Sequence, residues 1–274
     1  MDLKGRIEKA TDYIKSRIDF EPEIGIILGT GLGSLGDFIE NSTVIDYADI
    51  PEFPVSTVFG HAGRLIIGML EGKKVVAMQG RFHYYEGYTM QEITIPVRVM
   101  KMLGIKLLIA SNACGGLNPA FKAGDIMVIS DHINLMGSNP LLGPNLDEFG
   151  PRFPDMSEVY DRESIKLLER VADSLGFKIH KGTYGAVSGP NYSTKSELRM
   201  MIKIGCDTVG MSTIPEAIVA RHCGLRVAGI SCITDMAIPG IMVAPTHEEI
   251  VKVAESVKPR FVSLVKQFVK EVQL

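Results

Sequence analysis

The sequence predicts an α/β fold with a central mixed β-sheet flanked by helices. Short apolar runs typical of buried strands alternate along the chain with longer segments whose apolar residues recur at helical spacing. Glycine-rich sequences follow several of the apolar runs, as is common where a strand ends at a ligand site. We expect one domain over residues 1–274, because no repeat or low-complexity segment divides the chain.

The first elements follow from local patterns. Apolar residues from Leu3 to Ile18 recur at helical spacing, which predicts an N-terminal helix. Residues 24–28 form a short apolar run that indicates a buried strand. Residues 65–70 and 74–78 flank Glu71-Gly72-Lys73, which predicts a β-hairpin.

Strands and helices then alternate. A single apolar stripe from Met90 to Leu103 predicts one helix. Further strands are predicted at 106–110, 126–130, 178–187, 208–210 and 226–233. Further helices are predicted at 162–175, 194–204, 215–222 and 248–272. This alternation favours a mixed sheet with helical connections.

One segment, residues 134–157, has no periodic apolar pattern and is rich in proline and glycine. A long irregular segment in a compact domain is usually functional or disordered. Its apolar members suit a lid or a subunit contact, and they are Leu141, Leu142, Phe149 and Phe153. We expect a mobile loop here, with simple disorder as the alternative.

The overall composition excludes several classes of protein. Hydrophobic residues make up 46% of the chain and charged residues 22%, which is ordinary for a soluble globular protein. The net charge of −3 gives no basic field that would favour nucleic acid. No segment resembles a signal peptide or is apolar for long enough to span a membrane. The four cysteines form no CxxC pair and indicate reduced thiols of a cytoplasmic protein without a metal site.

The most informative stretch is Met78–Gly87. It follows a predicted strand and presents Arg81, His83 and Tyr85 on alternate positions, so an extended chain would place their side chains on one face. The arginine fork fits a phosphate, and histidine adds a neighbouring group whose charge varies near neutral pH. A solvated basic strand end is the alternative.

A glycine-rich stretch, Gly31–Gly36, matches the G-x-G-x-x-G spacing after a strand and raises a dinucleotide-binding interpretation. The acidic residue expected about 20 residues later falls near Glu52, between two prolines and not at a strand end. The smaller inference is that glycine backbone N–H groups approach an anion, with the Thr30 hydroxyl beside them.

Two more glycine-rich sequences lie at predicted strand boundaries. Gly60–Arg64 contains His61, and Ser111–Asn118 contains Ala113. Each alone is more often structural than functional. Together with Thr30 and the stretch around Arg81, they indicate one phosphate pocket at the ends of several strands.

These motifs, in their order and spacing, resemble the trimeric purine nucleoside phosphorylases over nearly the whole chain. The matching segments are Gly29–Gly33, Gly60–Gly63, Gln79–His83, Asn112–Asn118, Gly189-Pro190 and Gly210–Glu216. The resemblance implies a homotrimer of single α/β domains that cleaves purine nucleosides with inorganic phosphate. It also implies that no metal or organic cofactor is needed.

The resemblance assigns a role to each matching position. It implies that phosphate is bound by Thr30, His61, Arg81, His83, the backbone of Ala113, and Ser212. It implies ribose contacts from Tyr85, Met211, His247 near the 5′-hydroxyl, and Phe153 reaching a neighbouring subunit. It implies purine contacts from Tyr192, Ser193 and Asp235, with His83 and Asp235 as the catalytic groups.

Two base-pocket positions depart from the relatives that prefer 6-oxopurines. Those relatives carry Glu where this chain has Ser193, and Asn where it has Asp235. A protonated Asp235 would donate to adenine N7 and accept from N6–H, while Ser193 would donate to N1. We therefore expect adenosine to be accepted alone or beside inosine and guanosine. Waters that restore ordinary 6-oxopurine binding are the alternative.

Two other functions stay open from the sequence. Methylthioadenosine phosphorylases carry similar Asp and Ser residues in the base pocket, but His247 suits a 5′-hydroxyl better than a methylthio group. A non-catalytic nucleoside-binding protein would not need phosphate, ribose and base sites together.

Overall fold

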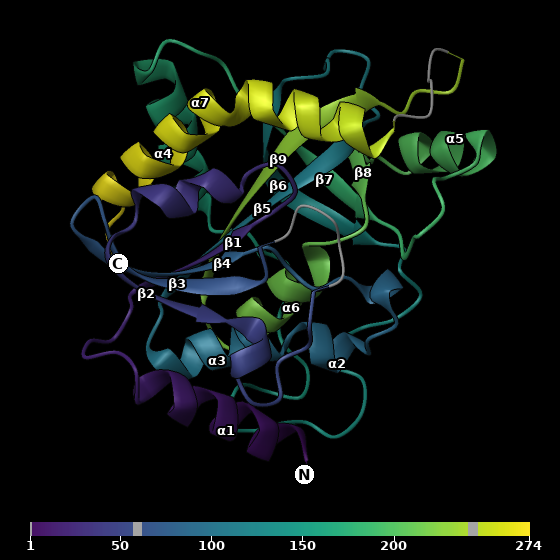
Figure 1. Cartoon of the computed structure of the whole chain (residues 1–274). Helices are drawn as coiled ribbons and strands as arrows, with labels where there is room; N and C mark the ends of the chain where they lie inside the picture. The colour runs from purple at the N-terminus through teal and green to yellow at the C-terminus, as the bar shows by residue number, and fades with distance from the viewer. Residues whose placement is uncertain (1, 57–61, 241–245) are drawn as a thin grey trace.

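A computed structural model describes residues 2–56, 62–240 and 246–274. Within these ranges a nine-stranded mixed sheet has helices on both faces, as predicted (Figure 1). The strands are β1 (Ile24–Leu28), β2 (Glu40–Asp46), β3 (Arg64–Leu70), β4 (Lys73–Gln79), β5 (Leu107–Gly116), β6 (Ile126–Asn134), β7 (His180–Ala186), β8 (Thr208–Gly210) and β9 (Arg226–Met236). The α-helices are α1 (Leu3–Lys15), α2 (Met90–Ile93), α3 (Ile95–Leu103), α4 (Arg162–Ser174), α5 (Lys195–Lys203), α6 (Ile214–His222) and α7 (His247–Glu271).

The sheet brings the ends of distant strands together. Its order is β2-β3-β4-β1-β5-β8-β7-β6-β9, and β9 also pairs with β5, which closes the second half into a ring. Strands β4, β1, β5 and β9 run parallel in successive pairs, so their carboxyl ends share one edge. That edge is where ligands bind in α/β sheets.

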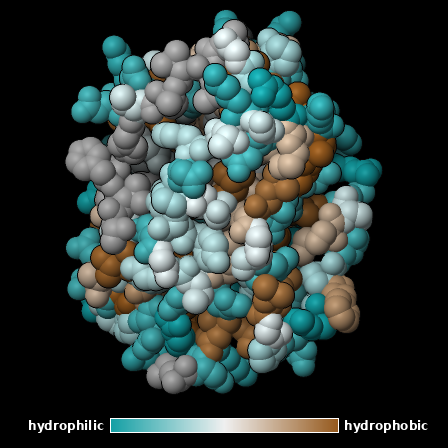
Figure 2. Space-filling view, turned by 90° about the vertical axis from the view of Figure 1, so that its right-hand side faces the viewer, coloured by the Kyte–Doolittle hydropathy of each residue, from teal (hydrophilic) through white to brown (hydrophobic). Residues whose placement is uncertain are grey.

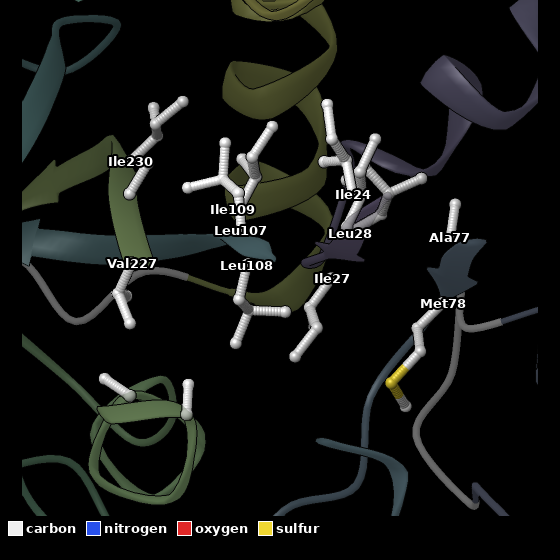
Figure 3. Packing of buried hydrophobic residues seen from close by; sticks show 14 of the residues in the cluster. Ile24, Ile27, Leu28, Ala77, Met78, Leu107, Leu108, Ile109, Val227 and Ile230 are labelled. Carbon is white, nitrogen blue, oxygen red and sulfur yellow. The ribbon is translucent and has the colours of Figure 1, made fainter. Parts of the chain in front are cut away.

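Two layers of helices bury the sheet. Helices α4 and α7 lie on one face, and α3 and α6 lie on the other, with α1 packed outside α3 (Figure 1). Leu108 and Ile109, neighbours on β5, point to opposite faces, as do Val227 and Ile230 on β9 (Figure 3). Because both faces are covered, these strands are buried almost throughout, and residues 107–110 and 227–230 form mostly apolar runs without alternation. This pattern is why their positions were predictable.

The strand predicted at 106–110 continues to Gly116, so the prediction that Ser111–Asn118 follows the end of a strand is wrong for most of that segment. One predicted helix is also divided, and one strand was missed. The single helix predicted from Met90 to Leu103 is divided at Thr94, whose φ of −106° and ψ of 1° are not helical. Thr94 Oγ1 donates to Met90 O at 2.8 Å, and Pro96 in the next helix has no amide hydrogen to continue the ladder. Strand β2 was not predicted, because most of its side chains are exposed and carry no apolar pattern.

The segment expected to be a loop contains no helix or strand between Asn134 and Arg162. It is tied to the rest of the molecule by hydrogen bonds from Gln91 Nε2 to Leu142 O at 2.8 Å and from Arg221 Nε to Asp155 O at 3.2 Å. Its mobility stays a prediction. Among the helices described, none has the length and apolar character of a membrane span.

Candidate active site

A cavity of about 340 Å³ lies at the edge where the parallel strands end. This volume falls within the range of small-molecule sites. Its walls come from the segments after β1 and β4, the carboxyl ends of β5 and β9, and the segments after β7 and β8.

Figure 2 shows the side of the molecule that carries α5. On this surface, hydrophobic residues gather in patches between hydrophilic ones.

The cavity collects most of the residues predicted from sequence. Those that line it are Thr30, Arg81, His83, Tyr85, Ala113, Tyr192, Ser193, Met211, Ser212 and Asp235. Phe153 does not line it, and its side chain is 89% exposed. His61 and the side chain of His247 lie outside the described part of the chain.

One group of cavity residues, which we call the Arg81 cluster, consists of Arg81, His83 and Ser212. Glu216 does not line the cavity and supports Arg81 from behind its wall. Arg81 Nε donates to Glu216 Oε1 at 2.9 Å, and the two side chains are only 2% and 4% exposed. Arg81 Nη1 donates to Ser111 O at 2.6 Å and to Ser212 Oγ at 3.3 Å. A buried guanidinium fixed in this way is a preorganised anion site.

His83 is held by an acidic neighbour. Its backbone N–H donates to Glu86 Oε1 at 2.6 Å, and its Nδ1 lies 3.2 Å from the same oxygen. Burial lowers the pKa of His83, while the hydrogen bond to Glu86 opposes that shift. When Nδ1 carries the proton and donates to Glu86, Nε2 is left to exchange a proton with a bound oxyanion.

The stretch from Arg81 to Tyr85 is not a continued strand. Strand β4 ends at Gln79, and Tyr84–Glu86 form a 3₁₀ turn, so the predicted alternation on one strand face is wrong beyond His83. The turn places the Tyr85 ring against the His83 ring, with centroids 4.7 Å apart and an interplanar angle of 15°. Burial raises the pKa of Tyr85 to about 12, so its hydroxyl stays protonated even at alkaline pH.

A second group, which we call the Asp235 cluster, consists of Tyr192, Ser193 and Asp235. Burial raises the pKa of Asp235, opposed by a hydrogen bond from Thr234 Oγ1 to Asp235 Oδ1 at 3.0 Å. Tyr192 is 51% exposed, and Ser193 is half-buried. A carboxyl group with a raised pKa can donate a proton to a ring nitrogen while its other oxygen accepts a hydrogen bond.

Two glycines let other groups approach closely. The pairing of β5 with β9 shifts register between Cys114 and Gly115, which brings Gly115 opposite Asp235. A β-carbon on Gly115 would lie 3.2 Å from Asp235 Oδ2, and one on Gly29 would lie 2.8 Å from the Asn112 Cα. The register shift in β5, together with the absence of side chains on these two glycines, therefore determines the shape of the cavity.

Three residues that support the cavity were not predicted from the sequence. They are Asn112, Thr213 and Glu216, which lie within the matching motifs but had no expected role. Glu216 sits 135 residues from Arg81, so only the fold reveals the pair. A buried arginine needs an acidic partner, and this requirement was the one signal in the sequence that could have indicated a residue such as Glu216.

The described residues contain no group of three or more His, Cys, Asp or Glu side chains arranged to hold a metal ion. All four cysteines are buried and unpaired.

The chain matches known proteins over almost its full length. The family model of the phosphorylase superfamily matches residues 23–270. Purine nucleoside phosphorylase 1 of Bacillus subtilis is 56% identical over 270 residues, covering 98% of this chain and 99% of that protein. The purine nucleoside phosphorylase of Mus musculus is 46% identical, covering 94% and 92%.

Solved structures agree with the sequence match. A crystal structure of the Schistosoma mansoni purine nucleoside phosphorylase in complex with adenosine matches with a TM-score of 0.94 and 42% identity, covering 98% of each chain. The same protein in complex with inosine also matches with a TM-score of 0.94 and 42% identity, covering 98% of this chain and 97% of that one. The chain therefore belongs to the phosphorylase superfamily, as a homologue of the purine nucleoside phosphorylases.

Proposed function

We propose that the chain cleaves purine nucleosides with inorganic phosphate, releasing the purine base and α-ribose 1-phosphate or its 2′-deoxy form. The observation that carries this proposal is that the Arg81 cluster and the Asp235 cluster line the same cavity. One supplies a fixed cation for an oxyanion, and the other supplies hydrogen-bonding groups suited to a purine. The named relatives, all purine nucleoside phosphorylases, support it.

The phosphate nucleophile is bound by Arg81, His83, Ser212, the Thr30 hydroxyl and the backbone of Ala113, with His61 as a further ligand. It attacks the anomeric carbon as the bond from ribose to purine lengthens. Positive charge grows on the ribose, and the adjacent phosphate anion stabilises it. Displacement in one step inverts the anomeric carbon and gives the α-anomer.

The ribose lies between the two clusters. Tyr85 and Met211 line the cavity there, and His247 binds the 5′-hydroxyl. Every relative named above is a purine nucleoside phosphorylase, which favours substrates with a 5′-hydroxyl over methylthioadenosine.

The leaving purine gains negative charge, mainly at N7, and needs a proton or a hydrogen bond. Asp235, with its raised pKa, supplies this proton and accepts from N6–H of adenine. Ser193 donates to N1, and the ring of Tyr192 covers the base. Adenosine is therefore a substrate beside inosine and guanosine, in keeping with the adenosine complex of the Schistosoma mansoni relative.

The enzyme is a cytoplasmic homotrimer that needs no metal or organic cofactor.

Phe153 lies on the irregular segment and is 89% exposed. It contacts the ribose site of a neighbouring subunit, where burial would remove its apolar ring from water. The substitution Phe153→Ala raises the KM for the nucleoside and leaves the KM for phosphate unchanged. An unchanged nucleoside KM in a trimer established by light scattering would contradict this role.

One assay tests the function. The protein is incubated with adenosine, inosine or guanosine, with and without phosphate, and free base is quantified. We expect base release that requires phosphate and is accompanied by an equal amount of ribose 1-phosphate. No release, or release that ignores phosphate, would exclude phosphorolysis.

A further inference from the structure

The turn that leads from β8 into α6 has an uncommon backbone. Thr213 has a φ of 71° and a ψ of −46°, and Ile214 N donates to Ser212 O at 2.8 Å. These values describe a γ-turn of the rare, strained kind. A β-branched residue at positive φ is a clear outlier, so the surrounding structure must hold it there.

A buried hydrogen bond fastens this turn to another strand. Asn112 Nδ2, in the middle of β5, donates to Thr213 Oγ1 at 2.9 Å. Asn112 is 1% exposed, and Thr213 is fully buried. The two residues are 101 positions apart, so this contact joins the turn to the part of β5 that forms a wall of the cavity.

This γ-turn fixes the positions of two residues that accept hydrogen bonds from Arg81. Ser212, its first residue, accepts from Arg81 Nη1 at 3.3 Å, and Ser212 Oγ lies 3.3 Å from Thr213 Oγ1. Glu216, in the first turn of α6, accepts from Arg81 Nε at 2.9 Å. A change in the backbone at Thr213 would move the Ser212 hydroxyl relative to the guanidinium.

A different buried threonine shows what a plain structural role looks like. Thr11 in α1 is fully buried, and its hydroxyl donates to the Ile7 carbonyl one helical turn earlier. Its backbone is helical, and its hydroxyl also contacts Met102 Sδ at 3.7 Å, which does not line the cavity. Thr213 instead combines strain, a distant partner and contact with a cavity-lining residue, the combination typical of functional sites.

We propose that Asn112 and Thr213 are positioning residues for the phosphate subsite: their hydrogen bond holds the strained turn that aims Ser212 Oγ at the oxyanion beside Arg81. This inference rests on the proposed phosphorolysis. Thr213 acts only through Ser212, because its own side chain is not part of the cavity wall.

The test compares Thr213→Val, which removes the hydroxyl at nearly constant shape, with Thr213→Ser, which keeps it. Loss of one buried hydrogen bond to a positioned group corresponds to about a tenfold change in a binding constant. We expect Thr213→Val to raise the phosphate KM about tenfold and the nucleoside KM by less than about twofold. Thr213→Ser should restore the phosphate KM.

Thr11→Val is the matched control, and it should lower the melting temperature without changing the phosphate KM. If Thr213→Val does not fold, Thr213→Ala is compared with Thr213→Ser in its place. A phosphate KM unchanged in the hydroxyl-free variant, or changed no more than the nucleoside KM, would overturn the inference.

Calorimetric titration with inorganic phosphate alone separates this inference from the proposed function. If the parent protein binds phosphate and releases no base, phosphorolysis fails while the comparison of variants still decides the role of Thr213. Weaker phosphate binding by Thr213→Val than by Thr213→Ser supports positioning, and equal binding contradicts it.

Discussion

The Arg81 cluster and the Asp235 cluster line one cavity but differ in burial and in support. Arg81 and Glu216 are 2% and 4% exposed and bonded to each other, whereas Tyr192 is 51% exposed. Arg81 follows β4 and bonds to Ser111 in β5 and Glu216 in α6. In the second cluster Asp235 lies on β9, but Tyr192 and Ser193 lie on a segment between β7 and α5. Groups held on several buried elements tolerate little change, and groups on a connecting segment can vary without disturbing the core.

This difference suggests a division of labour. The Arg81 cluster fixes the nucleophile, which is the same phosphate in every reaction cycle. The Asp235 cluster contacts the purine, which differs between substrates. Changes in the first should therefore affect stability and every substrate alike, and changes in the second should affect the choice of base.

The largest expected effect comes from Glu216→Ala. Removing one partner of a buried ion pair leaves the Arg81 charge uncompensated, and the free energy of unfolding should fall by about 3–5 kcal/mol. Urea denaturation measures this change. The control is Glu163→Ala, which breaks an exposed pair with Lys166 at 2.8 Å and should cost less than about 1 kcal/mol. Equal losses in the two variants would mean that the Arg81 cluster is not specially supported.

A smaller and more selective effect is expected from Asp235→Asn. The amide cannot transfer a proton to N7 of the leaving adenine, so the ratio of kcat/KM for adenosine to that for inosine should fall by about tenfold, equivalent to about 1.4 kcal/mol. Steady-state kinetics with both nucleosides measure the ratio. The phosphate KM should stay the same. A ratio equal to that of the parent would show that Asp235 does not select the base.

The pH dependence should be the smallest of these effects and should follow the raised pKa of Asp235. The active form is protonated, so its population is high below the raised pKa and falls as pH rises through it. The kcat/KM for adenosine should therefore decline on the alkaline side in the parent. In Asp235→Asn this decline should be absent in the same buffers. A decline of the same size in both would assign it to another group.

The sequence was enough to predict the α/β class, most helices, and the strands described here except β2. Buried strands such as β5 and β9 contain mostly apolar runs that stand out in the sequence, and the residues around Arg81 directly follow another such strand, β4. Edge strand β2 and the break at Thr94 escaped prediction, because exposed strands lack an apolar pattern and a helix break depends on local hydrogen bonds.

The missing parts of the site are long-range contacts. The bond between Arg81 and Glu216, and that between Asn112 and Thr213, join residues more than 100 positions apart. Neither pair leaves a local pattern in the sequence. The strained backbone of Thr213 is also invisible there, since threonine is not a residue that signals positive φ.

The measurement that tests the division of labour most directly is the kinetics of the double variant Ser193→Glu with Asp235→Asn. We expect its preference to move from adenosine towards inosine and guanosine, because the new carboxylate accepts from N1–H and the amide suits N7 and O6. Its phosphate KM should match that of the parent. An unchanged base preference, or a base preference that changes only together with the phosphate KM, would contradict a cavity with one fixed and one selective cluster.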